Sequence, residues 1–417
     1  MIAALALLVA LAQAKPELSP AELKGQQELT RVWTDFAKWC AEHGQKAAGQ
    51  EALAAAVAAG LPEKSAGSLK KSLDDSVEKP ADPALATKKS ETGVAAAKVH
   101  SKLLTQALAA KSPERADAAL AAEATLDPAA KSLKKDLAEL VKAALDRNWN
   151  EVAGRWLAKA KSVDPDAWSG GKYKDAQLAL GKKDVMLLGG GAHPLVAYVS
   201  LPASWTPAKK ELPVVVAVEG AGSNFAGCCR GFREARGARE AIVVTPCSFA
   251  NTNELDAKKY PWYDAATLEK CKQQGAARIG FDSAGLAEVL AELRRDFGAA
   301  EKFALTGFSG GGNLTYWWTF QHPEQLALVV GSCANFSGMG LQGAKPPADG
   351  GPPVTLLTGE KDDYNLEING QKPGIIGQTD HAEKELARLG FKSVARRVVP
   401  GAGHSNFAAE VWKLFLP

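Results

Sequence analysis

The chain has 417 residues, of which 46% are hydrophobic and 23% are charged, proportions typical of a folded globular protein. They exclude disorder throughout, and the length suits two to three domains. The 50 basic and 47 acidic residues leave a formal net charge of only +3, so no large basic surface is expected and nucleic acid is a poor candidate partner.

The first 14 residues, MIAALALLVALAQA, predict a cleaved signal peptide. An uncharged apolar run at 2–12 leads into the small-x-small pattern Ala12-Gln13-Ala14, and Lys15-Pro16 follows. A short membrane anchor is the alternative, but the run falls well short of the roughly 20 residues that cross a bilayer. Cleavage after Ala14 would leave a secreted or periplasmic protein with no membrane span.

Residues 15–167 are rich in Ala, Lys, Leu and Glu, which favour helices. Apolar residues recur at helical spacing, as at Leu133, Leu137 and Leu140. The Asp-Pro pairs at 127–128 and 164–165 lie 37 residues apart, and 148–165 resembles part of a tetratricopeptide-type (TPR-like) repeat. An Ala-rich helical bundle without a repeat is the alternative. We hypothesise that this region binds a protein partner or controls access of the substrate.

From 168 to 417 glycine becomes frequent, and apolar β-branched runs alternate with amphipathic segments. Strands that are apolar throughout and are separated by helices predict an α/β domain with a doubly wound, mostly parallel sheet. We expect helices at 284–297, 310–321 and 380–389, and strands at 184–188, 195–201, 213–218, 241–245, 302–307, 326–331, 354–358 and 393–399.

The segment Gly307-Phe308-Ser309-Gly310-Gly311 predicts a catalytic serine. It follows the apolar strand at 302–307 and precedes an amphipathic helix, which is the strand, G-x-S-x-G turn and helix of a nucleophile elbow. The glycines suit a tight turn that exposes the serine at the carboxyl end of the sheet. A glycine-rich turn with a surface serine is the alternative, but the strand-to-helix context favours Ser309 as a nucleophile.

A serine needs a base, and the base needs an acid to orient it. His404 follows the last expected strand, in a loop that would overhang the carboxyl edge of the sheet. Asp362 comes after the strand at 354–358 in a G-x-x-D arrangement, with Asp363 as the runner-up and Glu360 a distant third. The chain order Ser309, Asp362, His404 is the order in which α/β-hydrolases carry their triad.

Two backbone N–H groups are candidates for binding the negative oxygen of a tetrahedral intermediate. One belongs to Gly310, directly after the serine, and the other to Ala221, in the Glu219-Gly220-Ala221-Gly222 loop that follows the strand at 213–218. This loop resembles the H-G-x-G loop of many esterases, although Glu219 replaces the histidine. A glycine turn that only reverses the chain is the alternative.

Together these motifs resemble the α/β-hydrolase superfamily over about residues 184–417. The segments Tyr198-Val199-Ser200-Leu201-Pro202, 219–222 and 305–312 are similar to those of secreted polyhydroxybutyrate depolymerases and feruloyl or acetyl-xylan esterases. Dienelactone-hydrolase-like proteins and acyl-thioesterases share much of the pattern. The resemblance implies a serine esterase with a small or polymeric ester substrate, and it does not cover the helical region.

Two other functions stay open. One is a peptidase of the prolyl-oligopeptidase kind, although no strand repeat of a β-propeller is visible in the N-terminal part. The other is a binding or scaffold protein that uses the helical region, since a fold does not guarantee activity. Nothing in the sequence indicates a metal or an organic cofactor.

The aromatic segment at 258–264 lies in a long loop after a strand. Trp262 and Tyr263 are candidates for contact with the substrate, and packing within a surface loop is the alternative. Export would permit disulfides, and one or two bridges are expected among Cys228, Cys229, Cys247 and Cys271. For Cys247, as for Cys333, a buried thiol is the alternative.

Overall fold

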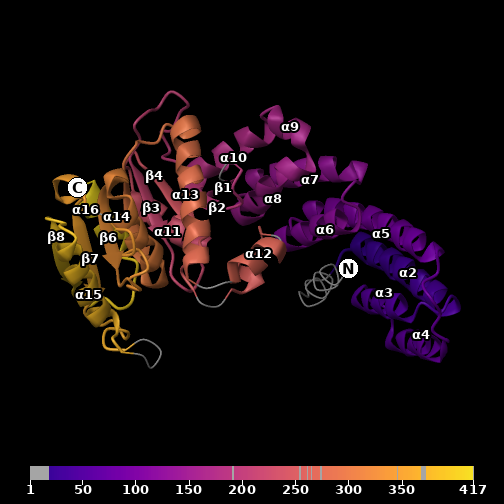
Figure 1. Cartoon of the computed structure of the whole chain (residues 1–417). Helices are drawn as coiled ribbons and strands as arrows, with labels where there is room; N and C mark the ends of the chain where they lie inside the picture. Colours follow the sequence, from indigo (N-terminus) through magenta and orange to yellow (C-terminus); the bar gives the residue numbers. More distant parts are fainter. Residues whose placement is uncertain are drawn as a thin grey trace. The chain divides into compact units, whose positions relative to one another are not determined.

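The computed structural model describes residues 18–189, 192–252, 255–260, 262–263, 265–272, 275–344, 346–367 and 372–416, without the side chains of 158, 161, 162, 169 and 276. The expected signal peptide at 1–14 lies outside these residues. The chain forms two compact units that divide between Ala176 and Gln177, whereas the change of composition led us to expect a boundary before 168. Helix α10, Lys172–Lys183, runs across the division (Figure 1).

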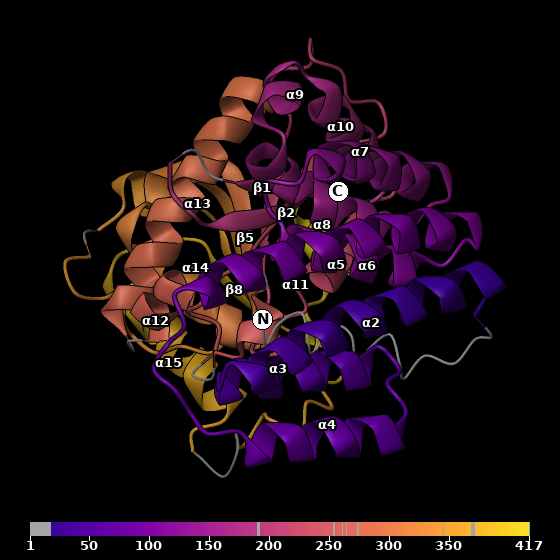
Figure 2. The ribbon, with the colours of Figure 1, turned by 90° about the vertical axis from the view of Figure 1, so that its right-hand side faces the viewer.

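The N-terminal unit is helical throughout its described residues, as predicted. Successive helices pack on each other, notably α2 on α3, α5 on α6 and α7 on α8, and α2 also packs on α5 (Figure 2). Its helices are α2 Pro20–Glu42, α3 Lys46–Ala58, α4 Glu63–Asp75, α5 Ala84–Ala109, α6 Pro113–Leu126, α7 Lys131–Asp146, α8 Asn150–Val163 and α9 Pro165–Ser169. The repeat interpretation stays a prediction.

Local sequence explains where these helices begin. Ser19 accepts a hydrogen bond from the Glu22 N–H, and the Glu22 carboxylate accepts one from the Ser19 N–H, which forms a capping box at the start of α2. Proline occupies the first turn of α2, α6 and α9, where its missing N–H removes no helical hydrogen bond.

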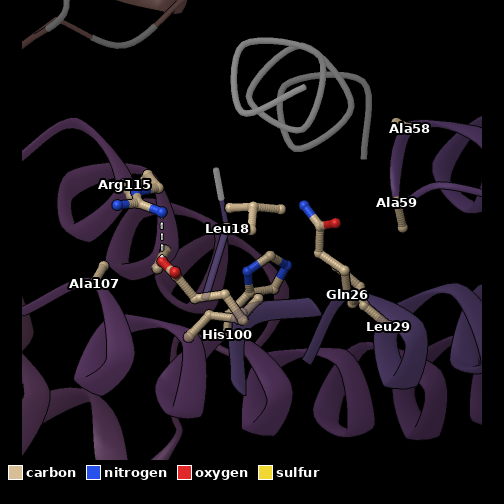
Figure 3. A pocket seen from close by; sticks show the side chains of 11 residues that line it. Leu18, Gln26, Leu29, Ala58, Ala59, His100, Ala107 and Arg115 are labelled. Atoms are coloured by element: carbon tan, nitrogen blue, oxygen red, sulfur yellow. Dashed lines mark ion pairs between the residues drawn. The ribbon is translucent and has the colours of Figure 1, made fainter. Parts of the chain in front are cut away.

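A small cavity of about 40 Å³ lies among α2, α5, α6 and the end of α3. Figure 3 shows His100 between Gln26 on one side and the ion pair of Arg115 with Glu22 on the other. The His100 side chain is buried, and neither of its ring nitrogens has a hydrogen-bond partner among the described residues. Burial lowers the pKa of His100 to about 4, so the imidazole is neutral near pH 7.

The C-terminal unit contains, among its described residues, an eight-stranded sheet in the order β1-β2-β4-β3-β5-β6-β7-β8. Pairing is antiparallel at β1-β2 and β2-β4 and parallel from β4 to β8. The strands are β1 Met186–Gly189, β2 Val196–Ser200, β3 Val214–Val218, β4 Ile242–Pro246, β5 Phe303–Phe308, β6 Leu326–Ser332, β7 Val354–Gly359 and β8 Val394–Val399. All eight overlap the strands expected from the sequence.

Helices cover both faces of this sheet (Figure 1). Alternate residues of β3 face opposite ways: Val214 and Val216 join the core under α13 and α14, and Val215 joins the core under α11 and α16. The helices are α11 Phe225–Arg236, α12 Ala265–Lys272, α13 Ala276–Phe297, α14 Gly312–Gln321, α15 Ile375–Arg388 and α16 Ala408–Phe415. The predicted doubly wound, mostly parallel α/β architecture is therefore confirmed.

Candidate active site

The expected nucleophile turn joins β5 to α14. Ser309 follows the last residue of β5 and begins a single 3₁₀ turn, Ser309–Gly311. Its φ of +48° is in the left-handed region, which a non-glycine residue adopts at a local energetic cost. A Cβ at Gly307 would lie 2.2 Å from Thr315 Oγ1, and one at Gly311 would lie 2.4 Å from Val218 O. These positions therefore have room only for glycine.

The expected base and acid are in contact. His404 Nδ1 lies 2.8 Å from Asp362 Oδ2, and the Asp362 side chain is fully buried. The other carboxyl oxygen, Oδ1, accepts a hydrogen bond from the Tyr364 N–H at 2.8 Å. An ionised carboxylate can only accept, so Nδ1 is the donor of this hydrogen bond, and in the neutral imidazole Nε2 is then the nitrogen that can accept a proton.

The structure separates Asp362 from the two other acidic candidates. Asp363 is exposed. Glu360 is exposed too, and its carboxylate accepts a hydrogen bond from the Gly401 N–H at 2.7 Å. Of the three acidic candidates, Asp362 is therefore the one that contacts His404, because the turn after β7 directs it inward and Asp363 and Glu360 outward.

Two aromatic rings flank His404. The ring centroid of Phe308, the residue before Ser309, lies 4.7 Å from the imidazole centroid, and that of Tyr364 also lies 4.7 Å away. The His404 side chain is 19% exposed. The imidazole is thus held beside the turn that carries Ser309, and the half-exposed Tyr364 lies on its other side.

Cys333, which sequence reasoning assigned no role, also borders the site. It follows the last residue of β6 with a φ of +43° and is completely buried. Its Sγ and atoms of Asp362 and His404 lie within 4.8 Å of one another. Burial raises the pKa of the Cys333 thiol to about 12, and a hydrogen bond to the Asp362 carboxylate acts in the same direction. The thiol therefore stays protonated and donates to the acid.

A thiol, a carboxylate and an imidazole at this spacing are also a set that binds metals. A metal ion needs the thiolate and a free imidazole nitrogen. The Cys333 thiol is protonated and the Nδ1 of His404 already contacts Asp362. Without a metal, the three groups are hydrogen-bonded to one another, with Asp362 between the Cys333 thiol and the His404 imidazole.

The loop after β3 lies beside the nucleophile, as the oxyanion assignment requires. A Cβ at Gly220 would lie 3.2 Å from the Cβ of Ser309. Ala221 is exposed and Gly310 is buried. The loop is closed by a hydrogen bond from the Ser223 N–H to Gly220 O at 3.0 Å.

Glu219 occupies the position of the histidine in the H-G-x-G pattern. It is 9% exposed, and burial raises its pKa. Its carboxyl group accepts hydrogen bonds from the Cys228 thiol on α11 and from the Gly220 N–H. Glu219 therefore anchors the loop from the inside and points away from solvent.

Trp262 and Tyr263, the candidates for substrate contact, differ in their surroundings. Tyr263 is buried in an aromatic cluster with Phe249 and Tyr260. Its hydroxyl accepts from the Val196 N–H at 3.0 Å and donates to Cys247 O at 3.2 Å. The half-buried Trp262 packs edge-on against Tyr198. These contacts favour the packing alternative for Tyr263.

The six cysteines are buried free thiols. The bridges expected among Cys228, Cys229, Cys247 and Cys271 are therefore not formed. Cys228 and Cys229 lie in the core between α11 and the sheet, whereas Cys247 and Cys271 lie in the aromatic cluster. The residues that flank a cysteine in the sequence do not distinguish a free thiol from a disulfide, because both are buried in apolar surroundings.

The sheet order, the turn at Ser309 and the contact of Asp362 with His404 define an α/β-hydrolase fold. Protein-family models and curated sequences give no match. Among solved structures, the chain is similar to poly(aspartic acid) hydrolase-1 from Sphingomonas sp. KT-1, with 19% identity over 56% of this chain and 97% of that one and a TM-score of 0.41.

Two further solved structures have comparable likeness. A CE1 ferulic acid esterase from Anaeromyces mucronatus has 16% identity over 56% of this chain and 89% of its own, with a TM-score of 0.37. A dipeptidyl aminopeptidase IV from Bacteroides ovatus, described as putative, has 14% identity over 55% of this chain and 34% of its own, with a TM-score of 0.40. Likenesses this distant do not identify a substrate, and the fold assignment rests on the topology and the turn.

Proposed function

We propose that this chain is a serine hydrolase that cleaves carboxylic esters through an acyl-enzyme. The observation that carries the proposal is the hydrogen bond between His404 Nδ1 and the fully buried Asp362 carboxylate, beside a strained turn that presents Ser309. Such an arrangement gives a serine hydroxyl the base that it needs to act as a nucleophile.

In the proposed reaction, Ser309 Oγ attacks the ester carbonyl carbon while His404 Nε2 accepts the hydroxyl proton. The carbonyl oxygen becomes negative and is bound by the N–H groups of Ala221 and Gly310. The tetrahedral intermediate then expels the alcohol, which takes the proton from His404. Water repeats the sequence on the acyl-enzyme and releases the acid, so that Ser309 is regenerated. Asp362 holds the imidazole in the required tautomer throughout.

The test is hydrolysis of p-nitrophenyl esters from acetate to octanoate by wild type and Ser309→Ala. We expect the variant to lose about 1,000-fold or more in kcat, because the residual rate of a triad mutant comes only from binding and the oxyanion donors. Wild type that cleaves none of the esters would contradict the ester proposal. A peptide p-nitroanilide and a fluorophosphonate label would then distinguish a peptidase from a protein without a reactive serine.

We propose further that the chain is exported, and its support is the sequence pattern at 1–14 alone. None of the helices in the described residues is long and apolar enough to cross a membrane. Sequencing the amino terminus of the protein recovered outside the cytoplasm is expected to begin at Lys15. An intact Met1 on that protein would contradict cleavage.

A further inference from the structure

Asn251 lies in the loop after β4 and contacts the loop that carries one proposed oxyanion donor. The residue is 2% exposed. Its Nδ2 donates a hydrogen bond to Gly220 O at 2.7 Å and lies 3.4 Å from Ser223 Oγ. Gly220 O also accepts the Ser223 N–H that closes the turn. The Asn251 amide therefore holds the peptide group whose N–H belongs to Ala221, since Gly220 C=O and Ala221 N–H are parts of one planar unit.

The same residue contacts the other proposed donor through its backbone. A Cβ added to Gly310 would lie 1.9 Å from Asn251 O, far inside any tolerated separation. The Asn251 carbonyl is thus packed directly on the residue that follows the nucleophile. One buried residue accordingly touches both halves of the oxyanion site, with its side chain on one and its main chain on the other.

The surrounding structure fixes Asn251 in place. The Asp282 carboxylate of α13, itself fully buried, accepts hydrogen bonds from the Phe249 N–H at 2.9 Å and the Ala250 N–H at 2.7 Å. From α14, Asn313 Nδ2 donates to Ala250 O at 3.2 Å. The buried hydroxyl of Tyr260 lies 3.3 Å from Asn251 Oδ1.

We propose that Asn251 is a positioning residue whose side-chain amide and backbone carbonyl set the spacing between the Ala221 and Gly310 N–H groups. The inference rests on the proposed serine hydrolase function. Oxyanion donors act because they are already placed where negative charge develops, so a shift of one donor weakens binding of the transition state more than binding of the substrate.

Asn251→Ala and Asn251→Asp test the proposal. Alanine removes the amide, and aspartate keeps its size but sets an acceptor against Gly220 O. We expect kcat to fall about 10- to 100-fold in both variants, while KM changes by less than about threefold. The loss should be smaller than the roughly 100- to 1,000-fold loss from a missing donor, because the donor is shifted and not removed. Gln321→Ala is the matched control. It removes an amide that donates to the Gly340 backbone carbonyl at 2.8 Å, at the far end of α14, and should leave kcat unchanged.

Binding of an alkyl trifluoromethyl ketone separates positioning from a general structural role. Its tetrahedral adduct with Ser309 carries the oxyanion, so its inhibition constant should rise in proportion to the fall in kcat/KM. An unchanged inhibition constant would overturn the proposal. The proposal would also be overturned if the fall in kcat only equalled the fall in the fraction of protein molecules whose serine reacts with fluorophosphonate. If Asn251→Ala does not fold, Asn251→Asp carries the same comparison.

Failure of the proposed function has a different signature. If wild type reacts with fluorophosphonate but cleaves no ester, the ester proposal is wrong. Asn251 is then tested on the rate of labelling by fluorophosphonate. This rate should fall about 10-fold or more in the variants, because phosphonylation uses the same donors. An unchanged labelling rate overturns the inference. Wild type that does not label at all contradicts both.

Discussion

At the scale of single residues, the site depends on which of two adjacent carboxylates points inward. Asp362 is buried against His404, and Asp363 is exposed one residue later. Both follow β7 and both suit the sequence pattern, so the difference between them appears only in the folded turn and its contact with His404. That turn is closed by a hydrogen bond from Asn365 Nδ2 to Gly359 O at 2.8 Å and by the Tyr364 N–H on Asp362 itself.

Replacing each aspartate by asparagine should therefore give opposite results. Asp362→Asn offers an amide N–H to His404 and favours the wrong tautomer, which in a triad lowers kcat by about 1,000- to 10,000-fold. Asp363→Asn should leave kcat and KM near the wild-type values. Steady-state kinetics on a p-nitrophenyl ester measures both. Equal losses in the two variants would show that neither aspartate is the specific partner of His404.

A second residue-scale prediction concerns His100 in the helical unit. Its pKa is about 4 in the folded protein and 6.5 when solvated, so the unfolded chain binds more protons between these values. Stability should thus fall as pH drops from about 6.5 to about 4, by at most ~3 kcal/mol. Glu123 lies in the same unit, and burial raises its pKa to about 7, so it titrates with the opposite sign.

His100→Leu isolates the histidine from such other groups. The variant keeps a similar volume and removes a buried imidazole whose nitrogens have no partner among the described residues. We expect the stability difference between variant and wild type to increase as pH is lowered through this window. Urea unfolding followed by circular dichroism at pH 4.5 and 7.5 measures it. A difference that is the same at both pH values would mean that His100 is solvated in the folded protein.

At the scale of elements, the elbow between β5 and α14 explains why the nucleophile motif is so rich in glycine. Gly311 has ordinary helical dihedral angles, with φ −62° and ψ −18°, so its requirement is for space and not for an unusual backbone. The carbonyls of Val218 and Glu219 fill the volume that a side chain would take. The close approach of β3 to the start of α14 is what brings the oxyanion loop to Ser309.

Gly311→Ala should therefore destabilise the C-terminal unit by about 1–3 kcal/mol, the usual penalty of overpacking, and should lower kcat as the oxyanion loop shifts. Gly280→Ala is the control. It lies in α13, where an added Cβ would meet no atom within 4 Å, and should stabilise the helix by about 0.5–1 kcal/mol. Thermal unfolding and kcat are measured for both variants. If Gly311→Ala is as stable and as active as Gly280→Ala, the elbow can accommodate a side chain at residue 311 and the prediction is wrong.

At the scale of the whole molecule, the proposed triad, the proposed oxyanion donors and the residues around Asn251 all lie within Gln177–Pro417. The second half of α10 is part of the C-terminal unit. Leu178 packs on the main core of this unit, and Gly181 O accepts a hydrogen bond from the Leu201 N–H at 2.9 Å. A division of the chain that keeps α10 intact therefore preserves every contact described for the site.

A fragment of residues 172–417 should accordingly fold and hydrolyse p-nitrophenyl esters with kcat/KM comparable to that of the full chain, as expected of a domain with its own core. A fragment that begins at Asp184 lacks α10 and should be less stable, because Met186 and Leu201 lose their packing against Gly181 of this helix. Thermal unfolding and kinetics compare the fragments. Loss of activity in the longer fragment would show that the helical unit contributes to the site.

Local patterns were sufficient for much of the fold. The strands were visible because runs such as 213–218 are apolar on both faces, and the elbow was visible because strand, glycine turn and helix are contiguous. The helices that were not foreseen include α11 and α16. The first starts next to the glycine-rich segment after β3, and the second follows the His404 loop after only a few residues. Turn-forming residues next to each helix make its 3.6-residue apolar pattern difficult to recognise.

The sequence by itself determined the helical or strand periodicity of most elements and the local motifs that contain Ser309, Asp362 and His404. Each of these patterns depends only on neighbours within a few residues. The tertiary structure decided that Asp362 and not Asp363 meets His404, that Cys333 and Asn251 lie at the site, and that the cysteines are unpaired. These outcomes depend on contacts between strands and loops far apart in the chain, and such contacts leave no periodic trace in the sequence.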